Sequence, residues 1–328
     1  MNNNILTNRH DFLLLFEVVN GNPNGDPDAG NLPRLDPNTN RGIVSDVCLK
    51  RKVRNYVELF PPKRVSDAAN GYNILIKQGS VIERAQQDAI KAAKDEGSIA
   101  GSSHAERAKN WLCREFYDVR TFGGVLSTGD DVLKGSAYGQ VRGPVQFTFA
   151  QSFHPITPLE VTITRCAVTK EEDAGKERTM GNKHIVPYAL YAAKGYVSPA
   201  FAERTGFTNA DLELLFQALL NMFEHDRSAA RGEMIVRGLY DFEHVGTQHP
   251  NNAEQNKKEA RLGCYHAHKL FEGIKVTLRE GRAFPESFAD YEVKCEWTEQ
   301  NLPRGIVLHL RHEIGPDGKH RTIGPKHG

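Results

Sequence analysis

The feature that most constrains this chain is the change at residue 20 from an apolar strand to a loop of turn-forming residues. Residues 12–19 are apolar except for Glu17, and a short apolar run that stops at turn residues is typical of a strand buried on both faces. Asn, Gly, Asp and Pro occupy ten of the eleven positions in residues 20–30. These residues allow turns with positive φ, which expose backbone N–H groups and let a ligand approach closely. The segment is therefore a candidate binding loop.

A basic helix is predicted after this loop. Ser45 is a suitable N-cap, and apolar residues recur at helical spacing as far as Val57. At roughly 100° per residue, Lys50, Arg51 and Arg54 fall within an arc of about 100° on the opposite face. We therefore predict an exposed strip of three cations, which could bind phosphates or could simply be a solvated helix surface.

Six strings along the chain resemble, in their order, the patterns of one known family. They are residues 20–26, 42–54, 116–124, 139–146, 178–188 and 221–234. Together they resemble the backbone subunit of the type I-C CRISPR surveillance complex, Cascade, a member of the RAMP superfamily that coats guide RNA. The resemblance covers most of residues 8–280. Residues 61–104 and the polar tail after Asn301 carry no matching motif.

The resemblance implies a non-enzymatic, RNA-binding subunit, of which several copies form a head-to-tail helical filament along the guide crRNA. Cations and loop N–H groups would hold the RNA backbone, leaving base edges free to pair with target DNA. The implied partners are crRNA, target DNA through the guide, further copies of the chain and the other type I-C Cascade subunits. The predicted RNA contacts are Asn22, Asn24, Lys50, Arg51, Arg54, Phe122, Gly123, Gln140, Arg142, Lys183, His184, Arg227 and Arg231.

Four of these contacts, Phe122, Gly123, Gln140 and Arg142, lie in glycine-containing loops at residues 122–124 and 139–143. Such loops permit close approach of an RNA backbone, with Phe122 stacking on a base and Arg142 pairing with a phosphate. The alternative is that Phe122 belongs to the core and the glycines only turn the chain. The resemblance favours RNA contact.

Another contact is open to two interpretations. Arg227 lies three residues after Glu224, so it could form a local helix pair instead of binding phosphate. Spacing alone does not separate the two roles.

The predicted fold is α+β, with an RRM/ferredoxin-like (split βαβ) core that carries large insertions. This prediction rests on a strand, helix, strands, helix, strand order along the chain. We expect a single RAMP-like domain over residues 1–328, with a variable helical insertion at 61–104 and a polar C-terminal tail at 301–328. A protruding hairpin at 168–184 resembles the family's thumb, which would reach across the RNA to the adjacent copy.

A metal-dependent ribonuclease of the same fold is the main alternative function. Asp26, Asp28 and Asp36 follow the first strand, and clustered carboxylates can hold Mg²⁺ and activate water for phosphodiester cleavage. Related RAMP backbone subunits of type III complexes use a loop aspartate after this strand to cut target RNA. However, Asp26 and Asp36 each precede proline, which is typical of turn initiation, so we favour a structural role.

A second group that could bind metal comprises Cys264, His266 and His268 with His244 and His249 upstream. His266 and His268 are separated by one residue and would lie on different faces of a helix. A structural zinc site also needs four ligands. We therefore expect ordinary helix-surface histidines, with no metal and no cofactor.

Composition limits how RNA can be held. The 328 residues include 42 basic and 41 acidic side chains, a net charge of +1, which argues against coating nucleic acid by bulk charge. RNA must therefore be held by clustered cations. The five cysteines are odd in number and lack a CxxC pair, and no apolar run approaches about 18 residues. We expect a cytoplasmic protein with no membrane partner.

Overall fold

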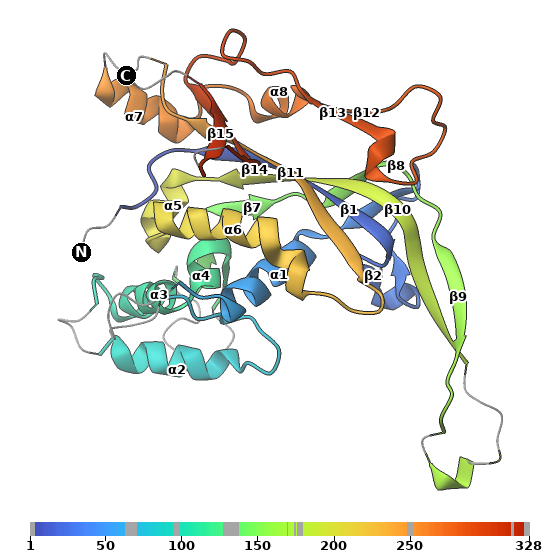
Figure 1. Cartoon of the computed structure of the whole chain (residues 1–328). Coiled ribbons are helices and arrows are strands. Elements are labelled where there is room, and N and C mark those ends of the chain that lie inside the picture. Colours follow the sequence, from blue (N-terminus) through green and yellow to red (C-terminus); the bar gives the residue numbers. More distant parts are fainter. Residues whose placement is uncertain are drawn as a thin grey trace.

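The computed structural model describes residues 4–62, 71–94, 99–126, 138–168, 170–173, 175, 180–247, 252–315 and 318–324. They form a mixed α and β fold around one large antiparallel sheet (Figure 1). The strand order is β15-β14-β11-β1-β10-β8-β4, and β7 and β9 also pair with β10. No helix in these ranges is both long and apolar enough to cross a membrane.

The strands are β1 (His10–Gly21), β2 (Gly25–Asp26), β3 (Leu32–Pro33), β4 (Arg41–Val44), β5 (Gly123–Val125), β6 (Gln140–Arg142), β7 (Val145–Phe147), β8 (Ala150–Pro155), β9 (Leu159–Thr164), β10 (Met180–Val197), β11 (Glu233–His244), β12 (Ile274–Leu278), β13 (Tyr291–Cys295), β14 (Ile306–Ile314) and β15 (His320–Ile323). The α-helices are α1 (Asp46–Leu59), α2 (Ile82–Ala92), α3 (His104–Glu115), α4 (Tyr117–Phe122), α5 (Pro199–Thr205), α6 (Asn209–His225), α7 (Ala253–Leu262) and α8 (Ala267–Glu272). The short 3₁₀ helices are η1 (Pro27–Ala29), η2 (Glu171–Asp173) and η3 (Phe288–Asp290).

β1 is the central strand, with β10 on one side and β11 on the other, both antiparallel to it. Its even-numbered apolar side chains pack into the core shared with α1 and α6, whereas Leu13 and Leu15 pack into a second core. Because successive side chains of a strand point to opposite faces, the prediction of a strand buried on both faces is confirmed. Glu17, the one charged interruption, is 2% exposed because its carboxylate accepts hydrogen bonds from Arg237 and Tyr188.

Both faces of the sheet are covered. α1 and α6 pack against each other over one face, and the β12–β13 hairpin with α8 covers the other (Figure 1). α2 and α3 form a helical lobe whose core includes Leu75, Ala89 and Val141. The described part of the predicted insertion therefore packs on α3 and β6.

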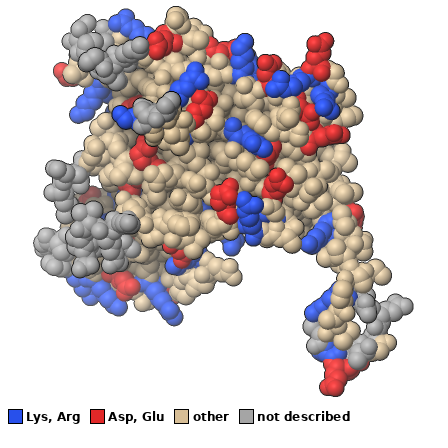
Figure 2. Space-filling view, viewed as in Figure 1, with Lys and Arg blue, Asp and Glu red and all other residues tan. Residues whose placement is uncertain are grey.

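A long hairpin, here called the arm, projects from the sheet. It consists of β9 and the beginning of β10, paired from Leu159 with Ile185 out to Thr164 with Met180. Figures 1 and 2 show the arm standing clear of the body, with acidic and basic side chains near its end. The hairpin predicted at residues 168–184 covers only the end and the returning strand of this arm, because β9 begins earlier. Its residues 169, 174 and 176–179 lie outside the described residues.

The tail predicted at residues 301–328 contains two strands of the sheet. β14 pairs with β11, and β15 pairs with β14. Arg311 on β14 is 8% exposed and forms ion pairs with Asp241 on β11 and Glu213 on α6, each at 2.8 Å. This part of the tail therefore fastens α6 to the sheet.

Candidate nucleic-acid interface

The loop after β1 is anchored by Asn22. Its backbone N–H donates to the Ala230 carbonyl at 2.6 Å, and its side-chain amide donates to the Asn31 carbonyl at 2.7 Å. Asn20 and Asn31 adopt positive φ angles of 47° and 66°, which asparagine tolerates better than most residues. The asparagine-rich sequence thus fixes the path of the loop and ties it to the segment before β11.

Asn24 positions the start of α1. Its Oδ1 accepts hydrogen bonds from both the backbone N–H and the hydroxyl of Ser45, each at 2.9 Å. Ser45 occupies the predicted N-cap position but makes no capping hydrogen bond with its side chain. The predicted position is right, and the Ser45 hydroxyl donates to Asn24 without accepting a capping hydrogen bond from α1.

The three cations predicted on α1 do not share an exposed face. Lys50 pairs with Asp46 at 2.8 Å and Arg54 pairs with Asp118 at 2.9 Å, and both basic side chains are only 12% exposed. Arg51 is exposed. The predicted strip is therefore wrong, because Asp118 of α4 lies against this face of the helix and withdraws Arg54 from solvent.

Phe122 is a core residue. It is 7% exposed, and the cations of Lys50 and Arg54 lie 5.8 and 5.3 Å from its ring centroid. A ring covered in this way is not available to a base, so the expectation that Phe122 stacks on RNA is corrected to the alternative of a packed aromatic. The cation–π contacts stabilise the junction of α1 with α4.

Gly123 allows β5 and β6 to lie close together. Its φ is 75°, and a Cβ at this position would lie 2.1 Å from the Val141 carbonyl oxygen. A side chain is therefore excluded here for both conformational and steric reasons. Its strand partner is Arg142, which like Gln140 is exposed on β6.

Residues 116–124 act mainly as a structural junction. The Asp118 carboxylate accepts hydrogen bonds from the backbone N–H groups of residues 75–76, at 2.9 and 3.0 Å. The Tyr117 hydroxyl donates to the Asp211 carbonyl at 3.1 Å. These bonds join α4 to the helical lobe and to α6.

Arg120 is the buried centre of this junction, and sequence reasoning did not identify it. It is 7% exposed and binds the Asp211 carboxylate through two hydrogen bonds of 2.8 and 3.1 Å. Its other donors reach the carbonyls of Gly71 and Cys113 at 2.8 Å and of Arg114 at 3.2 Å. Every side of the guanidinium is therefore engaged within the protein.

Four predicted cationic contacts come together near the end of β1. Lys183 and His184 lie where the arm joins the sheet. Arg227 and Arg231 lie in the segment between α6 and β11, to which the Asn22 N–H is hydrogen-bonded. Segments far apart in the sequence thus meet at one edge of the fold.

The arginines at this edge are ion-paired but accessible. Arg227 pairs with Glu224 at 2.8 Å and Arg231 lies 3.4 Å from Asp226, with basic side chains 56% and 37% exposed. The local pair predicted as the alternative for Arg227 is therefore present. Lys52, which sequence reasoning missed, is buried and also pairs with Asp226.

Buried polar atoms without partners gather at the same edge. Among the described residues, no hydrogen bond reaches Asn22 Oδ1, His184 Nδ1 or either ring nitrogen of His225, whereas Arg231 Nε lies 3.4 Å from the Asp226 carboxylate. Buried polar groups are normally hydrogen-bonded, so each such atom is a candidate for a ligand or water contact. We call this surface the β1 edge, defined by Asn22, Lys183, His184, Arg227 and Arg231.

The loop aspartates act as turn formers. Asp26 accepts a hydrogen bond from the Asp28 N–H at 3.2 Å, and Asp36 accepts from the N–H groups of Asn38 and Thr39 at 2.8 and 3.1 Å. The backbone hydrogen bonds lower the pKa of Asp36. Over the described ranges, no three His, Cys, Asp or Glu side chains are grouped to hold a metal ion. The structural role predicted for Asp26 and Asp36 is confirmed.

The histidines of the second candidate metal group make different contacts. His244 is buried, and its Nε2 lies 2.9 Å from the Asp11 carboxylate. The rings of His266 and His268 lie 5.7 Å apart. His249 lies outside the described residues. His244 therefore serves the packing of β11 against β1.

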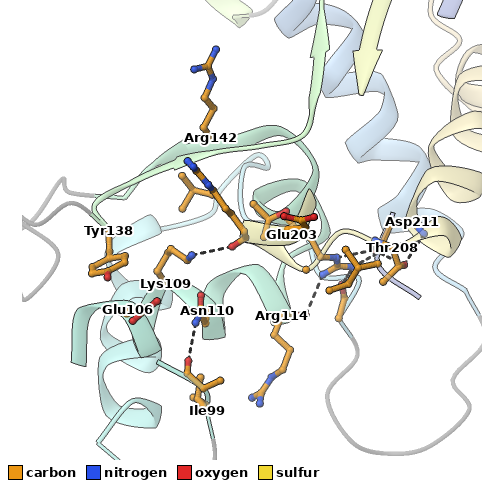
Figure 3. A pocket seen from close by; sticks show the side chains of 18 of the residues that line it. Ile99, Glu106, Lys109, Asn110, Arg114, Tyr138, Arg142, Glu203, Thr208 and Asp211 are labelled. Carbon is orange, nitrogen blue, oxygen red and sulfur yellow. Dashed lines mark hydrogen bonds and ion pairs between the residues drawn. The ribbon is translucent and has the colours of Figure 1, made fainter. Parts of the chain in front are cut away.

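A cleft of about 940 Å³ lies between α3, β6 and α5 and is lined by Gln140 and Arg142 (Figure 3). Lys109 reaches across it from α3 and donates to the Arg204 carbonyl of α5 at 3.0 Å. Tyr138 stands over Lys109, with the ammonium 6.0 Å from its ring centroid. We call this the α3–α5 cleft. The two predicted contacts on β6 thus belong to a surface distinct from the β1 edge.

Comparison with known proteins identifies relatives along most of the chain. The family described as CRISPR-associated protein Cas7 matches residues 8–296. A curated CRISPR-associated protein Cas7 of Haloferax volcanii is 29% identical over 226 residues, which cover 63% of this chain and 62% of that relative. Two solved structures are similar in part. The first, a CRISPR RNA-guided surveillance complex, pre-nicking, has a TM-score of 0.43 and 19% sequence identity, and the match covers 71% of this chain and 75% of that chain. The second, a CRISPR RNA-guided surveillance complex, has a TM-score of 0.41 and 15% sequence identity, and the match covers 74% of this chain and 72% of that chain.

Proposed function

Because the chain belongs to the CRISPR-associated protein Cas7 family, we propose that it is an RNA-binding structural subunit of a CRISPR surveillance complex. Several copies line up along the guide crRNA and present its bases to target DNA in antiviral defence. The observation that carries this proposal is the family match over residues 8–296, which includes every element from β1 to β13. The other subunits of a type I-C Cascade and a cytoplasmic location complete the proposal.

The β1 edge is the proposed contact with the guide. Its exposed arginines supply positive charge, and its unpartnered buried polar atoms supply further hydrogen-bonding capacity. Arg51 is the exposed cation of α1 and is assigned to the same RNA backbone. Arg54 and Lys50 are assigned to holding α1 on α4, because Arg54 is paired with Asp118 and Lys50 lies over the Phe122 ring. Backbone contacts of this kind leave base edges free.

The core is assigned to the split βαβ, RRM/ferredoxin-like type. Support comes from the order β11-β1-β10-β8, in which each neighbouring pair is antiparallel. In addition, α1 precedes β8 in the chain and α6 connects β10 to β11. A split βαβ arrangement has this alternation of strands and crossing helices.

The arm is assigned to contacts between copies, as the thumb of the filament. Leu159, Val161 and Ile163 alternate along β9, are each more than a third exposed, and belong to none of the cores of the described residues. Side chains at alternate positions share one face of a strand. The arm therefore offers an uncovered apolar face outside the body of the subunit.

The direct test of this function is binding without cleavage. We expect labelled, guide-length RNA to be bound and protected from added nuclease, and to remain uncut with Mg²⁺ or Mn²⁺, because Asp26 and Asp36 already accept backbone hydrogen bonds. Denaturing gels would measure cleavage, and fluorescence anisotropy would measure binding. Metal-dependent cleavage that is lost in Asp28→Ala but kept in Asp88→Ala, an exposed control on α2, would assign a ribonuclease instead.

A further inference from the structure

We propose that the α3–α5 cleft is a second nucleic-acid site, which binds the phosphodiester backbone of a single strand separately from the β1 edge. The strand is either another part of the guide or a second strand held by the guide-loaded protein. Both strands would present the same chemistry to the cleft, which is a row of phosphates with unpaired bases. The inference rests on the charges of the cleft and goes beyond the proposed contact at the β1 edge.

The first observation is that the cleft carries arginines without acidic partners. The guanidinium groups of Arg142 and Arg204 lie 4.6 and 5.7 Å from the ring centroid of Phe201. Within the described ranges, neither guanidinium makes a hydrogen bond or an ion pair with another residue. An arginine held by stacking keeps its donors free for bidentate binding of a phosphate.

The acids that line the cleft are already engaged. Glu203 is paired with Arg261, and Asp211 is paired with Arg120. Glu106 accepts hydrogen bonds from the Ser102 N–H and hydroxyl, at 2.7 and 2.6 Å. Glu203 and Asp211 are therefore neutralised by their own partners, whereas Glu106 keeps its negative charge and interacts with Lys109.

The remaining cations come from three elements at the cleft, and Figure 3 shows the Arg142 side chain directed away from Lys109. Lys109 extends from α3, Arg204 lies on α5 and Arg142 lies on β6 (Figure 3). The Lys109 ammonium donates to a carbonyl oxygen, lies over a ring and interacts electrostatically with the Glu106 carboxylate one turn earlier on α3. Three positive charges around one open volume favour a polyanion over a neutral ligand.

The lining also suits the bases of a single strand. Tyr138 presents a ring beside Lys109, and Gln140 and Asn110 supply amide groups. Aromatic rings interleaved with cations are typical of surfaces that bind single-stranded nucleic acid without reading its sequence. The volume of about 940 Å³ is at the upper end of the range of ligand pockets and leaves room for a nucleotide of the strand.

The test compares an Arg142→Ala/Arg204→Ala variant with a matched Lys258→Ala/Arg321→Ala variant, which removes two cations from α7 and β15. For each, anisotropy titrations would measure the affinity of guide-length RNA and then the capture of labelled single-stranded DNA by guide-loaded protein. Circular dichroism would check folding. Two lost phosphate contacts should weaken binding at 0.1 M salt on the order of tenfold and reduce the log–log salt slope by about 1.4.

The two titrations separate the sources of the strand. Loss of DNA capture with unchanged guide affinity would support a second strand, whereas weaker guide binding with a shallower salt slope would support the guide itself. If both titrations match the control variant, the proposed cleft site is overturned. If the variant binds both strands normally but its copies fail to assemble, the proposed cleft site is also overturned, and the cleft is assigned to a protein interface. Wild-type protein that binds no RNA would instead contradict the function proposed for the β1 edge.

Discussion

Replacing Arg120 by alanine should lower the free energy of unfolding by about 3–5 kcal/mol, the usual cost of removing one partner of a buried ion pair. The loss leaves the Asp211 carboxylate, whose side chain is 2% exposed, without its counter-charge. It also leaves the carbonyls of Gly71 and Cys113 without these donors. Urea denaturation followed by circular dichroism would measure the change.

A matched control lies in the preceding helix, α3. Arg114 is exposed, and its one ion pair among the described residues is with its neighbour Glu115, at 3.0 Å. Exposed pairs contribute about 0–1 kcal/mol, so Arg114→Ala should shift the unfolding midpoint little. If Arg120→Ala and Arg114→Ala were equally stable, the assignment of Arg120 as the centre of the junction would be wrong.

Replacing Arg51, Arg227 and Arg231 together by alanine should weaken guide-RNA binding on the order of a hundredfold at 0.1 M salt. Each phosphate contact contributes about 0.7 to the log–log salt slope for a single strand, so the slope should fall by about 2. The loss should be similar for RNAs of different sequence, because contacts to the backbone carry no sequence information. Anisotropy titrations at several salt concentrations would measure both quantities.

The control for this variant removes the same charge elsewhere. Lys258, Lys275 and Arg321 are exposed on α7, β12 and β15, outside the β1 edge and the α3–α5 cleft. Their replacement by alanine should leave affinity nearly unchanged. Equal losses in the two triple variants would show that RNA responds to net charge and not to the β1 edge.

Local pattern was sufficient to predict several elements of this fold. The apolar run of β1 and the asparagine-rich loop after it are encoded by neighbouring residues. The turn role of Asp26 and Asp36 is local in the same sense. Each of these features depends on residues only a few positions apart.

The errors arose where distant segments decide the environment. Helical periodicity grouped Lys50 and Arg54 correctly but could not show that Asp118 lies opposite Arg54, 64 residues away in the sequence. It also could not show that Lys52 is buried beside Asp226, which is 174 residues away. A helical pattern alone assigns such a cation to solvent, because it does not reveal an acidic partner on a distant segment.

The same limit applies to the candidate site. Lys183, His184, Arg227 and Arg231 were predicted individually from the family resemblance, and only the pairing of β10 and β11 with β1 brings them to one edge. The position of Arg204 in the α3–α5 cleft becomes apparent only when α5 lies beside β6 and α3.

The central claim is that copies of this subunit are added along a guide RNA through the arm. It can be tested with a variant that replaces residues 165–179 by Asn-Gly and also replaces Leu159, Val161 and Ile163, the exposed apolar face of β9, by threonine. Thr164 and Met180 are the last pair of the ladder, so a two-residue turn can join them and leave the sheet intact. Circular dichroism would confirm that this variant is folded.

The most direct measurement is the number of subunits bound per RNA as the RNA is lengthened, determined by native mass spectrometry at saturating protein. The account predicts that the copy number of the full chain rises in steps with RNA length, whereas the variant with the shortened arm binds RNA without adding successive copies in order. A single subunit per RNA at every length, or an identical series for both proteins, would contradict it.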